Sequence, residues 1–361
     1  MRRAISVAVA LSVLLLVPGL AAAKKKNRDP QEKIDILELD PKIARFLVRH
    51  VGGNQAKNKR LASLMDAVFS KKGLNITYGD SRTMTASETF DARTGNCLSF
   101  TVLFVAMARH VGLNAYFQEV AEVTSWDRRG DYILSNQHMF AEVEIDNGTV
   151  RVDFLAGREK RYRLVKRISD ERALAHFYNN LGAESLTDDD ADLALAYFER
   201  ALEADGTFNP AWTNKGVAFR RQGELERAEE AYQRALELDP TDLRAESNLA
   251  SLYLAWGRAA DARVHLAKAE SYQDKNPYHH YRLGVNAAKG GDTSAAIRHL
   301  REAIRRQPDD AELHASLADV YLKSEDRSRA QESLEKAVGL AKDEGEKERL
   351  TRELTALSSH R

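Results

Sequence analysis

The stretch NPAWTNKGVAFRRQGELERAEEAYQRALELDPTD, residues 209–242, decides the fold of the second half of the chain. Its pattern recurs every 34 residues between residues 175 and 344. A small residue marks the same position of each copy: Gly182, Gly216, Ala250, Gly284 and Ala318. A period of this length predicts stacked helical hairpins, because no single hairpin buries its apolar face without a neighbour.

Each copy also carries two alanines with a large residue between them. The alanine pairs are Ala194/Ala201, Ala228/Ala235, Ala262/Ala269, Ala296/Ala303 and Ala330/Ala337, and the large residues are Phe198, Tyr232, Leu266, Leu300 and Leu334. Small residues let the two helices of a hairpin approach closely, and the large residue fills the space to the next hairpin. We therefore expect an all-α solenoid of five repeats (175–208, 209–242, 243–276, 277–310 and 311–344), followed by a capping helix within residues 345–361.

The second copy resembles the tetratricopeptide repeat. It carries Trp212, Gly216, Phe219, Ala228, Tyr232, Ala235 and Pro240 at that family's positions. The resemblance implies a superhelical scaffold that binds a protein or peptide in its concave groove. On the first helix of each hairpin the groove-facing positions hold His176, Asn179, Thr213, Arg220, Arg221, Arg244, Ser247, Tyr278, Tyr281, Glu312 and Asp319, with no dominant charge. The alternative is that the repeats only pack on the N-terminal domain.

The start of the chain has the features of a signal peptide. Met1-Arg2-Arg3 is basic, residues 4–17 carry no charge, and Ala21-Ala22-Ala23 is a small-residue pattern typical of signal peptidase sites. We expect a signal peptide over residues 1–23, a basic linker over residues 24–32, export to the periplasm and no membrane span after cleavage. An uncleaved anchor is the alternative, since the 20 residues from 4 to 23 are long enough to cross a bilayer.

Charge argues against nucleic acid as a partner. The chain has 54 basic and 54 acidic residues, and loss of Arg2 and Arg3 with the leader leaves 52 against 54, a net charge of −2. Phosphate binding needs a basic excess or a basic patch, and none is evident. The histidines and carboxylates lack metal-ligand spacing, and no glycine-rich phosphate loop is present. We expect no cofactor.

Between leader and repeats, residues 33–172 have the pattern of an α+β domain. Helical spacing is found over residues 41–51 and 58–69, and again after Cys97 as far as Gly112, while residues 75–78 fit a short strand. Alternating residues predict strands over 116–123, 139–145 and 149–155, the last two joined across Asp146-Asn147-Gly148. One helix followed by an antiparallel sheet is an α+β arrangement.

Cys97 is the only cysteine of the 361 residues, so it forms no disulfide within the chain. It follows Gly95-Asn96 where a turn gives way to the apolar helix. The unpaired amides and the dipole at a helix N-terminus favour thiolate over thiol, which makes Cys97 a candidate nucleophile. The backbone N–H of Cys97 is then the natural first oxyanion donor, with Tyr78 or a backbone amide as the second.

A thiolate needs a base, and the base needs an orienting partner. Of the three histidines in this region, His50 and His110 lie too far along their helices, whereas His138 opens a predicted strand. Asp153 lies on the next strand, on the same face as His138. A two-residue turn at Asn147-Gly148 would pair Asp153 with Glu142, so the contact with His138 is expected to need a wider turn, a bulge or strong twist.

The segment TASETFDARTGNC, residues 85–97, resembles the approach to the nucleophile in the transglutaminase-like, papain-related superfamily. Residues 108–113 match the end of that family's helix, and residues 138–143 and 150–153 match its histidine and aspartate strands. The resemblance implies Cys97 as nucleophile, His138 as base and Asp153 as the group that fixes the imidazole tautomer. Leu98-Ser99 and Asn114 depart from the family pattern, and related repeat fusions sometimes lack the cysteine.

Two hypotheses follow from these patterns. The first is an exported cysteine acyl-transfer protein, in which Cys97 attacks an amide carbonyl and the repeats recruit a protein substrate. The second is a non-catalytic envelope scaffold, in which the repeats carry the function and the N-terminal domain is a degenerate relative of the enzymes. The reactivity of the thiol separates the two.

Overall fold

The computed structural model describes residues 28–52, 55–79, 82–129, 132–154 and 162–358. The expected signal peptide, residues 1–23, and most of the basic linker lie outside these ranges. The chain divides into two compact units. The first holds residues up to Ser125 and from Ser135 to Thr241, and the second holds Trp126–Leu134 and Asp242–Arg361. No helix among the described residues is long and apolar enough to span a membrane.

Three helices precede the cysteine in the first unit: α1 (Pro41–His50), α2 (Lys57–Phe69) and α3 (Ala86–Ala92). The first two confirm the predicted helices, and the third was not predicted. The side chain of Thr85 accepts a hydrogen bond from the amide of Glu88, and Glu88 bonds back to the amide of Thr85, so a capping box starts α3. Two short parallel strands, β1 (Thr77–Tyr78) and β2 (Thr94–Gly95), frame this helix.

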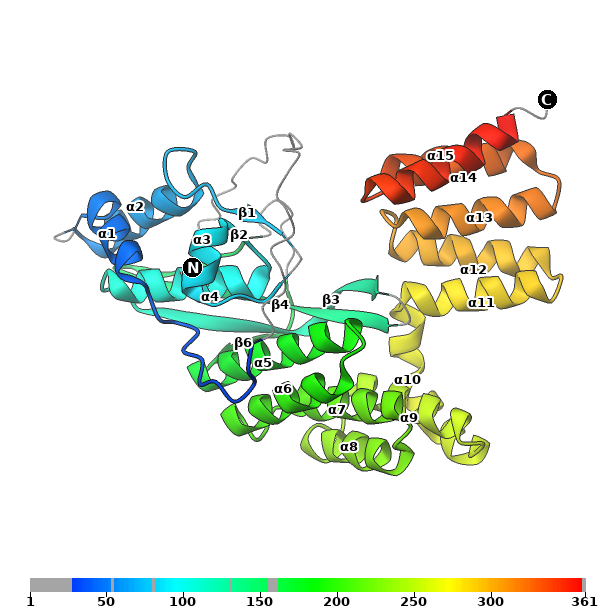
Figure 1. Cartoon of the computed structure of the whole chain (residues 1–361), viewed down its shortest axis with the longest axis horizontal. Helices are drawn as coiled ribbons and strands as arrows, with labels where there is room; N and C mark the ends of the chain where they lie inside the picture. The colour runs from blue at the N-terminus through cyan, green and yellow to red at the C-terminus, as the bar shows by residue number, and fades with distance from the viewer. Residues whose placement is uncertain (1–27, 53–54, 80–81, 130–131, 155–161, 359–361) are drawn as a thin grey trace. The chain divides into compact units, whose positions relative to one another are not determined.

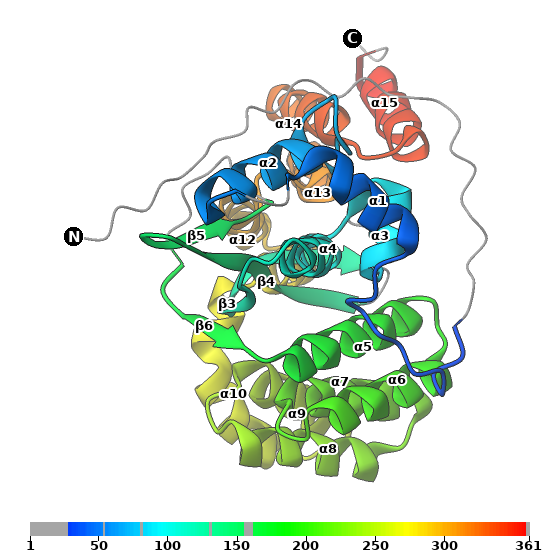
Figure 2. The same cartoon turned by 90° about the vertical axis from the view of Figure 1, so that its left-hand side faces the viewer.

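The helix α4 (Cys97–His110) is the centre of the first unit's core. Every residue from Leu98 to Ala108 is buried, as expected for a helix that is apolar on all sides. In Figure 2 it is seen nearly end-on, between α1–α3 on one side and the sheet on the other. Gly112 follows the helix with φ +75°, a left-handed conformation that glycine adopts without strain and that ends the helix as predicted.

A four-stranded sheet in the order β5-β4-β3-β6 completes the N-terminal domain. Its strands are β3 (Ala115–Arg129), β4 (Tyr132–Ile145), β5 (Gly148–Val152) and β6 (Val165–Ile168). The pairs β4–β5 and β3–β6 are antiparallel. This confirms the predicted α+β class, but β3 and β4 extend beyond the predicted strands 116–123 and 139–145. Figures 1 and 2 show α4 on one face of β3 and β4 and α5 on the other.

The rest of the described chain is helical (Figure 1). The five hairpins are α5 (Asp170–Thr187) with α6 (Ala191–Ala204), α7 (Asn209–Gln222) with α8 (Leu225–Leu238), α9 (Leu243–Ala255) with α10 (Ala259–Lys275), α11 (Pro277–Lys289) with α12 (Thr293–Arg306), and α13 (Ala311–Lys323) with α14 (Arg327–Leu340). They coincide with the five predicted repeats. A last helix, α15 (Glu344–Ser358), lies where the capping helix was predicted.

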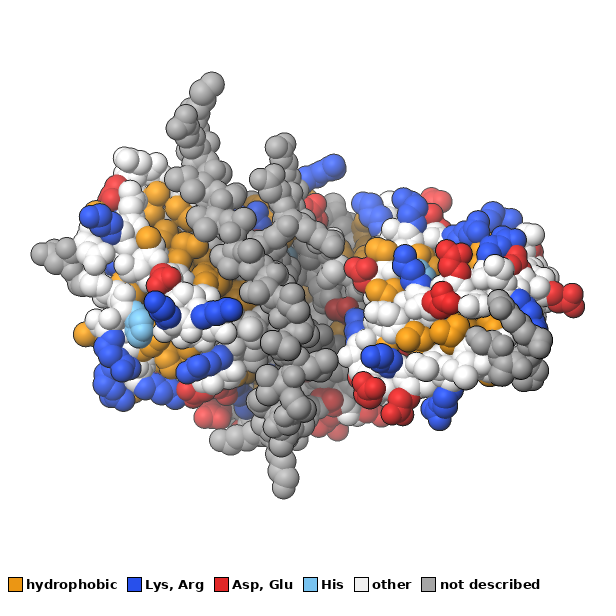
Figure 3. Space-filling model, turned by 90° about the horizontal axis from the view of Figure 1, so that it is seen from above, with side chains coloured by type: hydrophobic (Ala, Val, Ile, Leu, Met, Phe, Trp, Pro, Cys, Tyr) orange, Lys and Arg blue, Asp and Glu red, His pale blue; other side chains and the backbone are white. Residues whose placement is uncertain are grey.

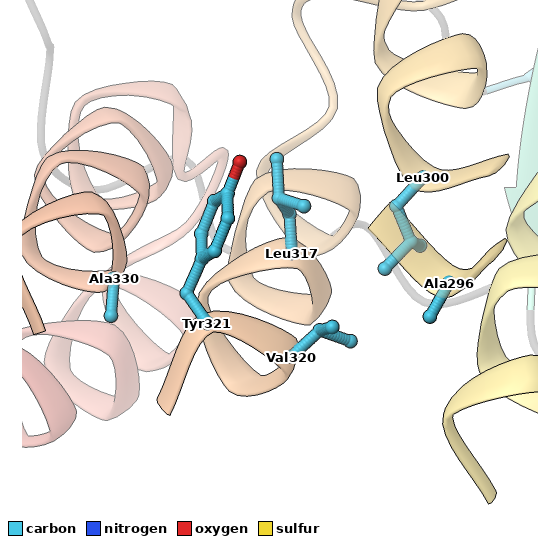
Figure 4. Packing of buried hydrophobic residues seen from close by; sticks show 6 residues of the cluster. All are labelled: Ala296, Leu300, Leu317, Val320, Tyr321 and Ala330. Carbon is cyan, nitrogen blue, oxygen red and sulfur yellow. The ribbon is translucent and has the colours of Figure 1, made fainter. Parts of the chain in front are cut away.

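The small and large residues of the repeat pack as the sequence predicted. A Cβ atom added to Gly182 would lie 2.4 Å from the ring of Phe198, so the two helices of that hairpin touch where glycine stands. Leu300 packs on Gly284 of its own hairpin in the same way. It also joins a buried cluster with residues of the following hairpin, as Figure 4 shows; the cluster contains Ala296, Leu300, Leu317, Val320, Tyr321 and Ala330.

A buried ionic network joins the first repeat to the sheet. Glu119 of β3, only 5% exposed, accepts a hydrogen bond of 3.0 Å from Arg172 of α5 and lies 3.3 Å from the Nε2 atom of His176. Arg172 also donates to Asp205 after α6 at 2.9 Å. Burial by itself raises the pKa of Glu119, but the neighbouring His176 and Arg172 lower it to about 2. The first repeat is therefore anchored to the N-terminal domain. For this repeat, the observation agrees with the alternative that the repeats pack on that domain.

Replacing Glu119 by glutamine is expected to lower the free energy of unfolding by about 3 kcal/mol, because the partly buried Arg172 would lose one of its two carboxylate partners. The folded-state pKa of Glu119 is about 2, below its ordinary 4.5. Its contribution to stability is therefore complete above pH 4.5 and is lost as the pH falls toward 2. Urea unfolding of both proteins should show a large difference at neutral pH and a smaller one in acid.

The matched control is Glu144→Gln. Glu144 lies on the neighbouring strand β4, where Asn114 donates a hydrogen bond of 2.9 Å to a carboxylate outside the core. Its replacement should leave stability at neutral pH unchanged. A Glu119→Gln protein as stable as the original at neutral pH would contradict the anchoring role of the network.

Candidate active site

Cys97 is the first residue of α4, as predicted, and its side chain is partly exposed. Asn96 caps the helix: its side-chain oxygen accepts a hydrogen bond of 2.9 Å from the amide of Ser99. The Nδ2 atom of Asn96 donates to Thr83 at 3.2 Å, which fixes the orientation of the capping side chain. At a helix start the first amides have no intrahelical acceptor. The amides of Cys97 and Leu98 therefore point along the positive end of the helix dipole.

The short parallel ladder places Tyr78 beside the strand that leads to the cysteine. Tyr78 pairs with Gly95, and the amide of Gly79 donates to the carbonyl of Gly95 at 3.0 Å. The side chain of Tyr78 is about half exposed, and its ring centroid lies 5.9 Å from that of Phe154. Its role as the second oxyanion donor, beside the backbone amide of Cys97, stays a prediction.

The structure brings His138 and Asp153 into direct contact. The Nε2 atom of His138 lies 2.8 Å from Oδ1 of Asp153, and the two side chains are only 2% and 8% exposed. His138 lies in the middle of β4, whereas the sequence analysis placed it at the start of a strand. The difference arises because the polar residues before it continue the hairpin and do not belong to a loop.

The register of the turn between β4 and β5 shows that His138 and Asp153 can meet without the wider turn or bulge expected from the sequence. Ile145 pairs with Gly148, so Asp146 and Asn147 form the turn and Gly148, with φ +140°, starts β5. Continuing from the pair Ala141–Val152 puts Asp153 opposite Phe140 instead of Glu142. Phe140 and His138 are two residues apart on one face, so a diagonal contact joins His138 to Asp153. The prediction of a wider turn, a bulge or strong twist was therefore wrong.

His138 also reaches the thiol. Cys97 lies near enough to raise the pKa of the imidazole, and Asp153 occupies Nε2, which leaves Nδ1 as the nitrogen available to the sulfur. Thr101, one turn along α4, connects helix α4 to strand β4. Its hydroxyl lies 2.6 Å from the carbonyl oxygen of Cys97 and 3.3 Å from that of Met139, the residue after His138. A single buried hydroxyl therefore ties the start of α4 to the middle of β4.

The charges around His138 favour its protonated form. Burial lowers the pKa of the imidazole, but the hydrogen bonds to Asp153 and Cys97 and their negative charges raise it to about 9. Burial raises the pKa of Asp153, yet His138 and Arg151 beside it hold that pKa below its usual value. At neutral pH the arrangement thus contains an imidazolium next to the sulfur and a carboxylate behind it.

Three side chains that the sequence analysis did not single out surround this pair. The guanidinium of Arg151 lies 4.1 Å from the ring centroid of Phe140 and 4.4 Å from that of Tyr162, and it also contacts Asp153. The ring of Tyr162 lies 5.3 Å from that of His138. Strand alternation could have placed Arg151 beside Asp153, because they are two residues apart. No local pattern pointed to Tyr162, which follows residues outside the described ranges.

The residues predicted to line the repeat groove differ in whether their side chains are buried, paired within the chain or exposed to solvent. Asn179, Thr213 and Tyr278 are buried: Asn179 bonds to Asn214 at 2.8 Å, and Tyr278 donates to Asp310 at 2.6 Å. Thr213 bonds to a carbonyl of its own helix. The others are placed as follows: Arg220 is exposed, Arg244 pairs with Asp242, Ser247 accepts from Gln273, and the ring of Tyr281 lies under Arg128. On the face drawn in Figure 3, acidic and basic side chains are interspersed.

No group of histidine, cysteine and carboxylate side chains suited to a metal ion occurs among the described residues. The site therefore offers a thiol at the start of a helix and, near it, an imidazole bonded to a carboxylate. These are the three kinds of group that nucleophilic catalysis by cysteine uses.

Comparison with protein families agrees with this arrangement. The model of the transglutaminase-like superfamily matches residues 45–154, the segment that holds Cys97, His138 and Asp153. Tetratricopeptide-repeat models match residues 175–208, 210–242 and 287–347. The chain joins a transglutaminase-like domain to tetratricopeptide repeats. The transglutaminase-like domain supplies the thiol site, and the tetratricopeptide repeats form the helical part.

Known relatives resemble parts of the chain. A TPR repeat-containing thioredoxin, TTL4 of Arabidopsis thaliana, is 34% identical over 36% of this chain and 20% of its own length. Lipopolysaccharide assembly protein B of Escherichia coli K12 is 27% identical over 48% of this chain and 44% of its own length. The chain thus spans less than half the length of these two relatives.

Two solved structures are also similar to part of the chain. A thermophilic tetratricopeptide-repeat protein of Thermus thermophilus matches with a TM-score of 0.38 and 23% identity over 50% of this chain and 99% of that one. The protein pilF of Pseudomonas aeruginosa matches with a TM-score of 0.39 and 18% identity over 53% of this chain and 90% of that one.

Proposed function

We propose that the protein is an exported cysteine acyl-transfer enzyme whose transglutaminase-like domain acts on amide bonds and whose repeats bind the protein substrate. The observation that carries the proposal is the contact of His138 Nε2 with Asp153 Oδ1 at 2.8 Å, in an imidazole whose pKa is also raised by the neighbouring Cys97. Export rests on the signal-peptide pattern of residues 1–23. N-terminal sequencing of the mature protein tests it, with Lys24 expected as the first residue.

The reaction follows from the position of each group. The Cys97 thiolate attacks the amide carbonyl carbon, a carbon–sulfur bond forms, and the electron pair of the carbonyl moves to oxygen. The amide of Cys97 at the start of α4 donates to that oxyanion. When the intermediate collapses, the carbon–nitrogen bond breaks, and the imidazolium of His138 gives its proton to the leaving amine. A thioester on Cys97 remains.

His138, now neutral, completes the cycle as a base. It takes a proton from water or from an amine while that molecule attacks the thioester carbon, and the carbon–sulfur bond breaks to return the thiolate. Water gives hydrolysis and an amine gives transamidation. Asp153 holds the imidazole in one orientation throughout and stabilises its positive charge. Hydrolysis is the default outcome because water is always available.

The alkylation rate of the single thiol tests this proposal. With His138 charged below a pKa of about 9, the Cys97 thiolate has a cationic neighbour from acid to mildly basic pH. We expect the folded protein to react with iodoacetamide at about pH 6 roughly 10-fold or more faster than the same protein in concentrated urea, where a cysteine has its ordinary pKa of about 8.5. Near pH 9 the two rates should converge. Equal rates at both pH values would remove the support for an activated thiol.

A non-catalytic scaffold is the second candidate. It is favoured by the five repeats and by relatives whose names denote assembly, such as lipopolysaccharide assembly protein B of Escherichia coli and photosystem I assembly protein Ycf3 of Synechococcus. In that case Cys97 reacts no faster in the folded protein than in urea. The two candidates therefore predict opposite results in the same experiment.

A further inference from the structure

The tip of the long β3–β4 hairpin belongs to the second compact unit, together with the last three repeats. Hairpin tips usually expose their side chains to solvent. Here Trp126 is only 9% exposed, and its ring centroid lies 4.9 Å from that of Tyr272 on α10. A large aromatic side chain that is buried at a hairpin tip has a specific contact surface, and that surface lies on the repeats.

A basic residue follows at the next position on the same face of the strand. The guanidinium of Arg128 lies 5.2 Å from the ring centroid of Tyr281 on α11, a cation–π contact. Asp310 and Glu312, at the start of α13, attract the same guanidinium. Residues two apart on a strand point the same way, so Trp126 and Arg128 face the repeats together.

The receiving surface has the complementary composition. Tyr272 and Tyr281 provide aromatic faces, on which an indole and a guanidinium both pack favourably. Asp310 is held in place by Tyr278, which donates to it at 2.6 Å, and Glu312 by Arg349 at 3.0 Å. Tyr278, Tyr281 and Glu312 are first-helix residues, which the sequence analysis assigned to the groove.

We propose that this surface of tyrosines and carboxylates on repeats 3 to 5 binds an extended peptide segment. The segment has an aromatic residue and, two positions later, an arginine. The chain's own Trp126-Asp127-Arg128 occupies the surface. A partner peptide of the same chemistry competes with the tip. Because the tip is tethered to the repeats, its effective concentration is high and a free peptide binds the intact protein weakly. The inference names the partner chemistry for the repeats of the proposed function, and its test is independent of thiol chemistry.

The test uses the full-length mature protein and a fluorescent synthetic peptide that copies residues 122–137. Fluorescence anisotropy should show weak binding to the unaltered protein. Arg128→Glu places a negative charge against Asp310 and Glu312 and weakens the tethered contact. Trp126→Ala removes the buried ring. Each change should tighten peptide binding by about 10-fold or more, because the surface is released.

Two controls decide whether the released surface is the one described. Adding Tyr281→Ala to Arg128→Glu should abolish the gained binding, and a peptide lacking both the tryptophan and the arginine should bind to neither protein. Ile133→Ala, at a tip residue that is 43% exposed, should behave like the unaltered protein. Thermal unfolding of each variant confirms that it is folded, and Arg128→Glu carries the test if Trp126→Ala does not fold.

Three results would overturn the proposal. The first is equal peptide affinity for the unaltered protein and for folded Arg128→Glu. The second is binding that persists after Tyr281→Ala. The third is a gain in affinity with Ile133→Ala as large as that with Arg128→Glu. Retained turnover of an amide substrate in these variants leaves the acyl-transfer proposal standing in each case.

Discussion

Cys97→Ala is expected to lower kcat/KM for an amide substrate by about 10⁴-fold or more, because no other group in the site can form the thioester. The chain has no second cysteine to substitute for it. Turnover is measured as release of ammonia or amine from a peptide library rich in glutamine, followed by mass spectrometry. The same measurement on the unaltered protein should detect an acyl group on Cys97.

The fold should survive this substitution. Alanine is a good helix former at the start of α4, and the Cys97 side chain is only partly buried. The thermal midpoint and peptide binding by the repeats should therefore stay unchanged. A Cys97→Ala protein that keeps its turnover would contradict the nucleophilic role directly. If the Cys97→Ala protein loses turnover because it has unfolded, its thermal midpoint will show this. Cys97→Ser then tests the nucleophilic role of Cys97.

His138→Ala has the second largest expected effect, a loss of about 10³-fold or more in kcat/KM. The substitution removes both the cation beside the sulfur and the base for the second half of the reaction. It also deprives the buried Asp153 of its imidazole partner. The iodoacetamide rate at about pH 6 should fall to that of the urea-unfolded chain, while the rate near pH 9 should change little.

His110→Ala is the matched control for this experiment. His110 is an exposed histidine at the far end of α4, thirteen residues from Cys97, and it takes no part in the site. Its loss should affect neither turnover nor alkylation. A His138→Ala protein that alkylates as fast as the unaltered one at about pH 6 would show that the imidazole does not activate the thiol.

Much of the fold could be predicted from sequence because its signals are local or periodic. The 34-residue period specified the five hairpins, and a helix start at Asn96-Cys97 followed from the change from turn residues to an apolar run. Gly182 stands at a fixed position of the repeat, and the close approach of the two helices that its contact with Phe198 shows was predicted from that pattern. In each case a short local pattern of residue types is enough to indicate the backbone structure.

The rest depended on register and on distant contacts. Asp146-Asn147 and Asn147-Gly148 are both plausible turns, and only the ladder from Ile145–Gly148 to Ala141–Val152 decides between them. The polar segment 125–137 lacks clear alternation, because its tip contacts the repeats and not a sheet core. Tyr162 reaches His138 from a separate part of the chain, which no spacing rule could indicate.

The network of Glu119, Arg172, His176 and Asp205 has a practical consequence for dissecting the protein. A fragment cut at residue 172, where the sequence suggests that one domain ends, would strip Glu119 of His176 and Arg172 of Asp205. A fragment that contains the transglutaminase-like domain should instead end after Asp205, so that it retains the first helical hairpin.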